Sequence, residues 1–97
     1  MKPLVFTPSA RGDLRAIWFY SYENWGRDQA DAYTDAIEAA CQALARSRTA
    51  GRRVSGRDSY RKLIVRSHVL YVREYPDRIE VIRILHVRQD PDTHLGA

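Results

Sequence analysis

Three side chains near the C-terminus of this 97-residue chain could take part in catalysis or bind an anion. Arg83, His86 and Arg88 interrupt the largely apolar run 79–90. Arginine can hold a phosphate or a carboxylate through paired hydrogen bonds, and histidine can transfer a proton near neutral pH. Such a set could cleave a phosphodiester or contact a partner. Arg83 and His86 could equally be satisfied by hydrogen bonds inside the fold.

The remaining histidines and nearby carboxylates raise the question of a metal site. The candidates are His68, His86 and His94 with Asp90 and Asp92. No two histidines have the i, i+4 spacing of a zinc-binding helix, and the single cysteine leaves no cysteine pair to complete a structural site. A glycine-rich phosphate loop and a nucleophile elbow are also missing. We therefore expect no metal, no cofactor and no standard catalytic motif.

Composition limits the class of protein. One cysteine, Cys41, excludes an internal disulfide, and its place on an apolar helical stripe predicts a small buried hydrophobe. No run of 18 uncharged apolar residues suggests a membrane span, so we expect a cytoplasmic protein without membrane contact. A length of 97 residues predicts one domain, residues 1–97.

Charge is unevenly distributed along the chain. Residues 1–45 carry four basic and six acidic side chains, a net charge of −2, whereas residues 46–97 carry twelve and six, a net charge of +6. The two net charges sum to the overall net charge of +4. A basic C-terminal half favours an acidic partner, either a nucleic acid or an acidic protein surface.

The run 79–90 itself predicts the central strand of a sheet. Alternation at period two would place Val81, Arg83, Leu85 and Val87 on one face, and Glu80, Ile82, Ile84 and His86 on the other. Both faces are then mainly apolar, as in a strand covered on both sides. On this spacing Arg83 and His86 point in opposite directions, so the three candidate residues could share one site only if the strand bent at Leu85.

Two amphipathic helices precede this strand. Thr7 and Pro8 supply a capping side chain and a first helical residue, and Gly26 supplies a stop. Asp28 lies in the first turn of the second helix. The predicted buried stripe of the first helix is Leu14, Ile17, Trp18, Tyr22 and Trp25, and that of the second is Ala30, Tyr33, Ile37, Ala40, Cys41 and Leu44. The short connection predicts an antiparallel helix hairpin.

The other elements complete a two-layer α+β fold. Strands are predicted at 4–6, 60–65 and 68–75, which with 79–90 gives the order βααβββ and a mainly antiparallel sheet. Residues 49–58 are predicted to be a loop, with basic side chains at Arg46, Arg48, Arg52, Arg53 and Arg57 that could grip phosphates. One helix hairpin covers only one sheet face, so we expect the other face to meet a partner.

A set of residues spread over almost the whole chain resembles a known family. They are Thr7-Pro8, Ala10, Asp13-Leu14, Ile17-Trp18, Tyr22, Trp25-Gly26, Gln29-Ala30, Gly51, Tyr60-Arg61, Leu63, His68-Val69-Leu70-Tyr71, Arg83-Ile84-Leu85-His86, Arg88 and Asp90-Pro91. In order and spacing the chain resembles the ParE branch of the ParE/RelE toxin superfamily from bacterial toxin–antitoxin pairs.

The resemblance implies both a fold and a function. It implies the same βααβββ fold and a growth-inhibiting toxin that stalls DNA gyrase on cleaved DNA, blocks replication and is neutralised by a ParD-like antitoxin. A higher-order hetero-oligomer with the antitoxin is also expected. We assign target binding to Arg83, His86, Arg88 and Asp90. We assign antitoxin binding to Trp18, Tyr22, Trp25, Tyr33, Ile37, Tyr71 and Arg73.

The alternative is the related RelE branch, whose members cleave messenger RNA on the ribosome. Catalysis would then fall to Arg83, His86 and Arg88. The chain departs from that branch, because His68 stands where those toxins tend to carry an arginine and no tyrosine follows Arg88. We therefore favour a protein-binding toxin over a nuclease. Direct binding of nucleic acid stays open.

Overall fold

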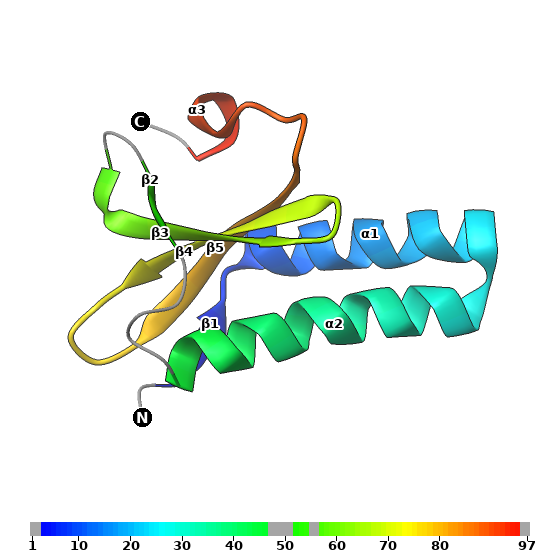
Figure 1. Cartoon of the computed structure of the whole chain (residues 1–97), viewed down its shortest axis with the longest axis horizontal. Coiled ribbons are helices and arrows are strands. Elements are labelled where there is room, and N and C mark those ends of the chain that lie inside the picture. Colours follow the sequence, from blue (N-terminus) through cyan, green and yellow to red (C-terminus); the bar gives the residue numbers. More distant parts are fainter. Residues whose placement is uncertain (1–2, 47–51, 55–56, 96–97) are drawn as a thin grey trace.

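A hairpin of two long helices packs on one face of a five-stranded sheet (Figure 1). The structure is a computed structural model that describes residues 3–46, 52–54 and 57–95. Its elements are β1 (Leu4–Phe6), α1 (Pro8–Trp25), α2 (Arg27–Arg46), β2 (Arg52–Val54), β3 (Arg57–Val65), β4 (His68–Glu74), β5 (Ile79–His86) and α3 (Pro91–His94). The predicted α+β class and the helix hairpin are confirmed.

The sheet order is β1-β5-β4-β3-β2. The antiparallel meander β3-β4-β5 is as predicted, and β1 adds to β5 in parallel. As predicted, β5 is an inner strand, with β4 on one side and β1 on the other.

Local signals in the sequence set the helix boundaries. The Thr7 hydroxyl accepts a hydrogen bond from the Ala10 N–H at 3.1 Å, which caps α1, and Pro8 takes the first helical position. At the other end Gly26 has φ 87°, a left-handed conformation that glycine adopts without a steric penalty. Its N–H donates to the Tyr22 carbonyl at 2.9 Å. Because only Gly26 separates the helices, they must run antiparallel.

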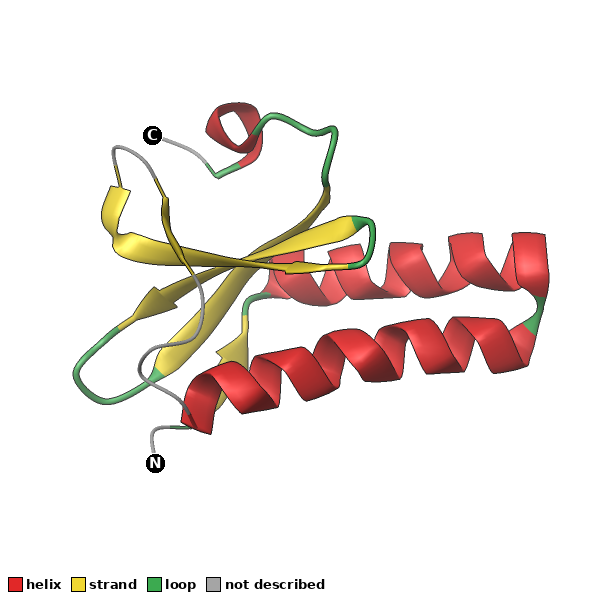
Figure 2. Cartoon of the chain, viewed as in Figure 1, coloured by secondary structure: helices red, strands yellow, loops and turns green. Residues whose placement is uncertain are grey.

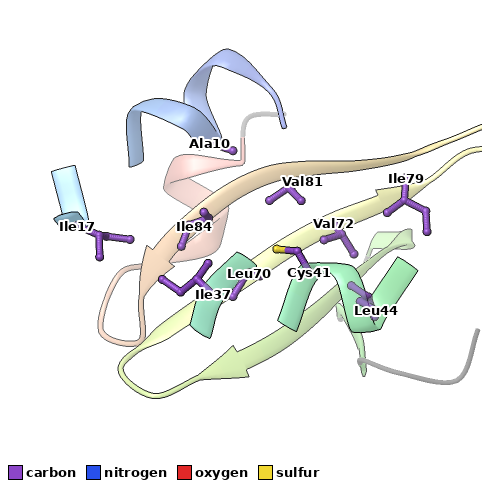
Figure 3. Packing of buried hydrophobic residues seen from close by; sticks show 10 residues of the cluster. All are labelled: Ala10, Ile17, Ile37, Cys41, Leu44, Leu70, Val72, Ile79, Val81 and Ile84. Atoms are coloured by element: carbon purple, nitrogen blue, oxygen red, sulfur yellow. The ribbon is translucent and has the colours of Figure 1, made fainter. Parts of the chain in front are cut away.

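The main core lies between the hairpin and the sheet (Figure 3). It contains Ala10, Ile17, Ile37, Cys41, Leu44, Leu70, Val72, Ile79, Val81 and Ile84. Cys41 is fully buried, and burial together with the Glu38 charge raises the pKa of its thiol to about 12. The thiol is therefore protonated at neutral pH and acts as packing, as predicted.

A β-bulge in β5 changes which side chains share a face. Tyr71 pairs with Arg83 but Val72 pairs with Val81, so Ile82 is the extra residue. As a result Val81 and Ile84 both face the main core, whereas strict alternation placed them on opposite faces. That part of the prediction is wrong. The irregularity also lies at Ile82 rather than at Leu85, where a bend was considered.

Two boundaries differ from prediction. Strand β5 ends at His86, four residues early, because a turn closed by Gln89 N–H to the His86 carbonyl at 2.9 Å follows it. Residues 52–54 and 57–58, predicted as loop, belong to β2 and β3, which pair with each other. Residues 49–51, 55 and 56 of the predicted loop, and Arg48 just before it, lie outside the described residues.

The second sheet face is partly covered by the chain itself. Asp90 caps the short α3 through its carboxylate and the Asp92 N–H at 3.0 Å, and Pro91 begins the helix. Leu95 then packs in a second cluster with Val69, Tyr71 and Leu85. Figure 2 shows α3 as a separate turn of helix away from the hairpin. This face was expected to find cover outside the helix hairpin, and the chain itself provides part of that cover, although Ile64 is 63% exposed.

Candidate functional site

Arg83 forms the most extensive polar contact in the described part of the chain. Its guanidinium donates to both oxygens of the Asp13 carboxylate, from Nε at 2.7 Å and from Nη2 at 2.9 Å. Nη1 donates to the His94 carbonyl at 3.1 Å. The hydrogen bonds that Asp13 accepts raise the pKa of Arg83. Arg83 thus joins α1, β5 and the C-terminal segment.

Asp13 also completes the edge of the sheet. β1 ends at Phe6, so β5 has no strand neighbour beyond Ile82 on that side within the described residues. The Asp13 Oδ2 atom accepts the Ile84 N–H at 2.9 Å in place of a strand carbonyl. Because buried backbone groups need partners, this carboxylate stabilises the sheet edge as well as pairing with Arg83.

His68 and His86 face each other across β4 and β5 near the hairpin. They are a register pair, and their ring centroids are 5.4 Å apart. The Tyr33 hydroxyl lies 2.7 Å from His68 Nδ1 and accepts the Ser67 N–H at 3.1 Å. Burial, then the His86 charge, lower the pKa of His68, although Asp13 opposes this. His68 is therefore neutral at physiological pH.

The two remaining target-binding candidates lie beyond the strand. Arg88 and Asp90 are exposed. The Arg88 N–H donates to His86 Nδ1 at 3.2 Å. Asp90 accepts from Asp92 N–H and from the Thr93 hydroxyl, so its carboxylate serves α3. The structure thus brings His86 and Arg88 together and holds Arg83 separately on Asp13.

The residues weighed as candidate metal ligands, and not expected to bind a metal, do not converge. His68 and His86 are close, but the His94 ring instead contacts the Gln89 amide at 3.5 Å and Asp90 caps α3. Across residues 3–46, 52–54 and 57–95, no group of three or more metal-binding side chains is present.

The far end of the hairpin carries a large aromatic surface. Both helices extend past the end of the sheet (Figure 1), so the apolar stripe of α1 continues where no strand of the described chain covers it. Trp25 is 63% exposed and Tyr22 46% exposed, so neither is a core residue; of the two roles predicted for Trp25, core or interface anchor, the interface role stays a prediction. Trp18 is half-buried, and its indole N–H donates to Asp31 at 2.8 Å.

The aromatic rings at this end form two groups. The outer aromatic group is Trp18, stacked on Tyr22 at 5.2 Å and edge-on to Phe19 at 5.3 Å. It borders a groove of about 270 Å³ lined by Arg11, Leu14, Arg15, Trp18, Thr34 and Glu38. The inner aromatic pair is Tyr20 and Trp25, with centroids 5.9 Å apart.

The inner pair lines a larger hollow, which we call the hairpin pocket. It has a volume of about 530 Å³ and lies between the underside of the hairpin and the β3–β4 turn. Its lining is Ala16, Ile17, Tyr20, Ser21, Trp25, Tyr33, Ser67, His68 and His86.

The other predicted antitoxin-binding residues are differently placed. Ile37 is fully buried and Tyr71 is 4% exposed, so each packs inside the protein rather than offering its side chain to a partner. Burial, then the charges of Asp90 and Asp92, raise the pKa of Tyr71. Arg73 is half-buried and lies over the rings of Tyr60 and Tyr75.

Sequence reasoning missed three features of the site. The Asp13–Arg83 pair joins positions 70 residues apart, and no local pattern indicates it. Tyr33 was assigned to the apolar stripe of the second helix and to antitoxin binding, although its hydroxyl also accepts the Ser67 N–H of the β3–β4 turn. Phe19 and Tyr20 were overlooked, yet five aromatic residues in the eight positions 18–25 cannot all fit one helical stripe. That density was the available signal for an exposed surface.

The fold and the sequence together define the class of protein. A solved structure described as "Chromosomal ParDE TA system from P. aeruginosa" has the same fold, with a TM-score of 0.80 at 24% identity over 91% of this chain and 98% of that one. Toxin ParE1 of Mycobacterium tuberculosis is 37% identical over 93 residues, covering 94% of this chain and 95% of the relative. Toxin ParE1 of Caulobacter vibrioides is 35% identical over 97 residues, covering 99% and 100%. The chain is a toxin of the type II toxin–antitoxin class.

The family follows from the same comparisons. Residues 4–91 match the family described as "ParE toxin of type II toxin-antitoxin system, parDE". The chain belongs to this ParE toxin family, as its resemblance indicated.

Within the described residues no helix combines the length and apolar character needed to cross a bilayer.

Proposed function

We propose that this toxin arrests growth by binding and inhibiting DNA gyrase, and that a ParD-like antitoxin neutralises it. Membership of the ParE family is the observation that carries the proposal, because ParE-like toxins act on this target. The structure supports a protein-binding role. Arg88 and His86 lie at an accessible strand end, where a contact surface needs no convergent catalytic geometry.

The state of Arg83 weighs against the ribonuclease alternative. Cleavage of RNA needs a base, an acid and a cation that meet at one phosphate. Arg83 is already bound to Asp13 at 2.7 Å and to the His94 carbonyl. Of the two arginines considered for catalysis, Arg88 is therefore the one whose exposed guanidinium could meet a phosphate.

Arg88 provides the test of the target. Arg88→Ala should abolish growth arrest on induction in a bacterial host while leaving the melting temperature unchanged, because the side chain is exposed. Arg15→Ala removes the same charge from an exposed position of α1 and serves as the matched control.

The decisive measurement is a supercoiling assay with purified toxin and gyrase. We expect supercoiling to stop and cleaved DNA to accumulate with the parent and with Arg15→Ala, but not with Arg88→Ala. If gyrase works normally while ribosome-bound messenger is cut in an Arg88-dependent manner, the ribonuclease interpretation is correct and our proposal fails.

We further propose that the antitoxin covers the outer aromatic group and the neighbouring groove between α1 and α2. Exposed tryptophan and tyrosine are typical anchors of protein interfaces, and a groove between helices suits an amphipathic helix. Arg11 and Arg15 line the groove with a single acidic residue, Glu38, and this excess of positive charge favours an acidic helix. Such a permanent complex should bury more than roughly 2,000 Å² in total.

The antitoxin surface is tested with the protein encoded beside the toxin. Co-purification and calorimetry should show a tight complex with the parent chain. A toxin that stays monomeric and fully active in the presence of that protein would contradict the proposal.

A further inference from the structure

The hairpin pocket has the dimensions and lining of a ligand site. Its volume of about 530 Å³ falls in the usual range for small-molecule pockets, roughly 300–1,000 Å³, and a few polar groups converge on a mainly apolar wall. Neither Arg88 nor the outer aromatic group lines it. Of the residues proposed to contact gyrase, His86 lines the pocket, so a ligand there would share that one residue with the proposed gyrase contact.

The hydrogen-bond network determines which ring nitrogen of His68 and of His86 carries the hydrogen and can donate to a ligand. Tyr33 Oη accepts from the Ser67 N–H, so its own hydrogen is directed at His68 Nδ1. His86 Nδ1 accepts from the Arg88 N–H. In the neutral state both rings then carry their hydrogen on Nε2, where none of the described residues is bound. The pocket thus presents two N–H donors.

This arrangement disfavours a metal as the ligand. A metal bound at Nε2 requires the hydrogen to move to Nδ1. His86 Nδ1 faces the Arg88 N–H, and two hydrogens cannot occupy one hydrogen bond. No carboxylate of the described residues lines the pocket either, so its polar groups suit an anion or another group rich in acceptors.

The aromatic wall and the surrounding charge limit the chemical class of the ligand further. Tyr20 and Trp25 are each 63% exposed, so ring faces are open for a flat partner. Arg66 lies over the Tyr33 ring at 5.4 Å, which places one cation beside the site, and the Arg88 backbone N–H contacts His86. Aromatic faces next to cationic and N–H donors are the combination that binds single-stranded nucleic acid.

We propose that the hairpin pocket binds one nucleotide of a single-stranded nucleic acid. The base stacks on Tyr20 or Trp25, and the phosphate accepts from His68 and His86. A carboxylate of an acidic peptide could use the same donors, but it has no flat surface for the two open rings. A duplex binds more weakly, because its bases are not free to stack.

The test measures binding of a fluorescent single-stranded 12-mer by anisotropy at fixed ionic strength. Because the base stacks on one ring of this pair, Tyr20→Ala or Trp25→Ala should weaken binding about 10-fold, the usual effect of losing the stacking partner. His86→Phe should also weaken it, because the ring remains but the donor is lost. Phe19→Ala and Arg15→Ala are the controls. They alter an exposed aromatic of the outer group and an exposed cation, and should leave affinity within about 2-fold.

A second measurement does not depend on variants that fold. The chain has two tryptophans, so the two indole N–H resonances can be told apart with Trp18→Phe. The single strand should shift the Trp25 signal and leave the Trp18 signal unchanged, whereas an acidic peptide of equal charge should not. Absence of binding, equal loss in the control variants, or the same Trp25 shift with the peptide would each overturn the proposal.

Discussion

The two ends of the helix hairpin differ in what lies beneath the same apolar stripe. At the base, the stripe meets the sheet, and Ala10, Ile17, Ile37 and Leu44 are buried. At the far end the stripe continues beyond the sheet, and Trp25 stays exposed. An amphipathic pattern therefore predicts a face that seeks cover, but the chain itself covers only part of that face.

Polar side chains follow the same division. At the base, Asp13 and Arg83 saturate each other and the sheet edge, so they hold the fold together. Near the far end, His68 and His86 keep their Nε2 donors available, and Tyr20 keeps its ring exposed. Stability and binding are thus separated along one hairpin, and substitutions at its two ends should change different measurements.

The largest effect on stability is expected at the base. Arg83→Ala leaves Asp13 and the His94 carbonyl without their cation in a site where the Arg83 and Asp13 side chains are only 24% and 16% exposed. Loss of one partner of such a pair should lower the free energy of unfolding by about 2–4 kcal/mol, measured by urea titration.

Arg78→Ala is the matched control for Arg83→Ala. Arg78 also forms ion pairs, with Asp77 and Glu80, but at the surface. Its removal should leave the unfolding midpoint nearly unchanged. If Arg83→Ala unfolds at the same urea concentration as the Arg78 variant, the distinction between the two ends of the hairpin is lost.

The next effect is on binding at the far end. Tyr22→Ala removes a ring of the outer aromatic group that is 46% exposed, so stability should stay within about 0.5 kcal/mol of the parent. Affinity for the antitoxin should fall by about 2 kcal/mol, which is roughly 30-fold, as for an interface anchor. Calorimetry measures the affinity. Tyr20→Ala, which removes a 63% exposed ring outside the outer aromatic group, is the control and should change neither quantity.

The fold was largely accessible from local sequence signals. Thr7, Pro8 and Gly26 determine where α1 begins and ends, and period-two runs indicate β3, β4 and β5. The bulge at Ile82 was not accessible, because it reflects how β5 fits β4 and the start of α1 at once. The short α3 and the cover provided by Leu95 were missed for the same reason, since both depend on a distant sheet face.

The candidate site was only partly accessible. The composition of the last strand pointed to Arg83, His86 and Arg88, but their division into one structural and two accessible residues depends on Asp13. Likewise Tyr33 and His68 look like ordinary members of a helix and a strand. Only the approach of the hairpin to the β3–β4 turn shows that they bind each other.

A smaller effect is expected where the two regions meet. Tyr33→Phe removes a hydroxyl that accepts from Ser67 and contacts His68, so stability should fall by about 1–2 kcal/mol. The amide hydrogen of Ser67 should also exchange faster with solvent. Tyr20→Phe, which removes the hydroxyl of a 63% exposed tyrosine, should have no such effect. Equal exchange rates in both variants would show that Tyr33 does not hold the turn.

The smallest effect concerns pH and isolates His68. Burial and the nearby His86 lower the pKa of His68 in the folded protein, although Asp13 acts the other way. Tyr33 of α2 and Arg66 of the adjoining turn also face this region, and neither supplies a negative charge at neutral pH. The unfolded chain therefore binds more protons than the folded chain once the pH falls below about 6.5, the ordinary histidine value. Stability should be highest above that pH and should decrease as the pH falls through the lowered pKa of His68.

Urea midpoints between pH 8 and pH 5 will show this slope. His68→Gln should reduce the slope, whereas His94→Gln, on α3 and away from Tyr33, should retain it. A slope that persists in full in His68→Gln would mean that another group controls the pH dependence and that His68 is not held neutral by the hairpin.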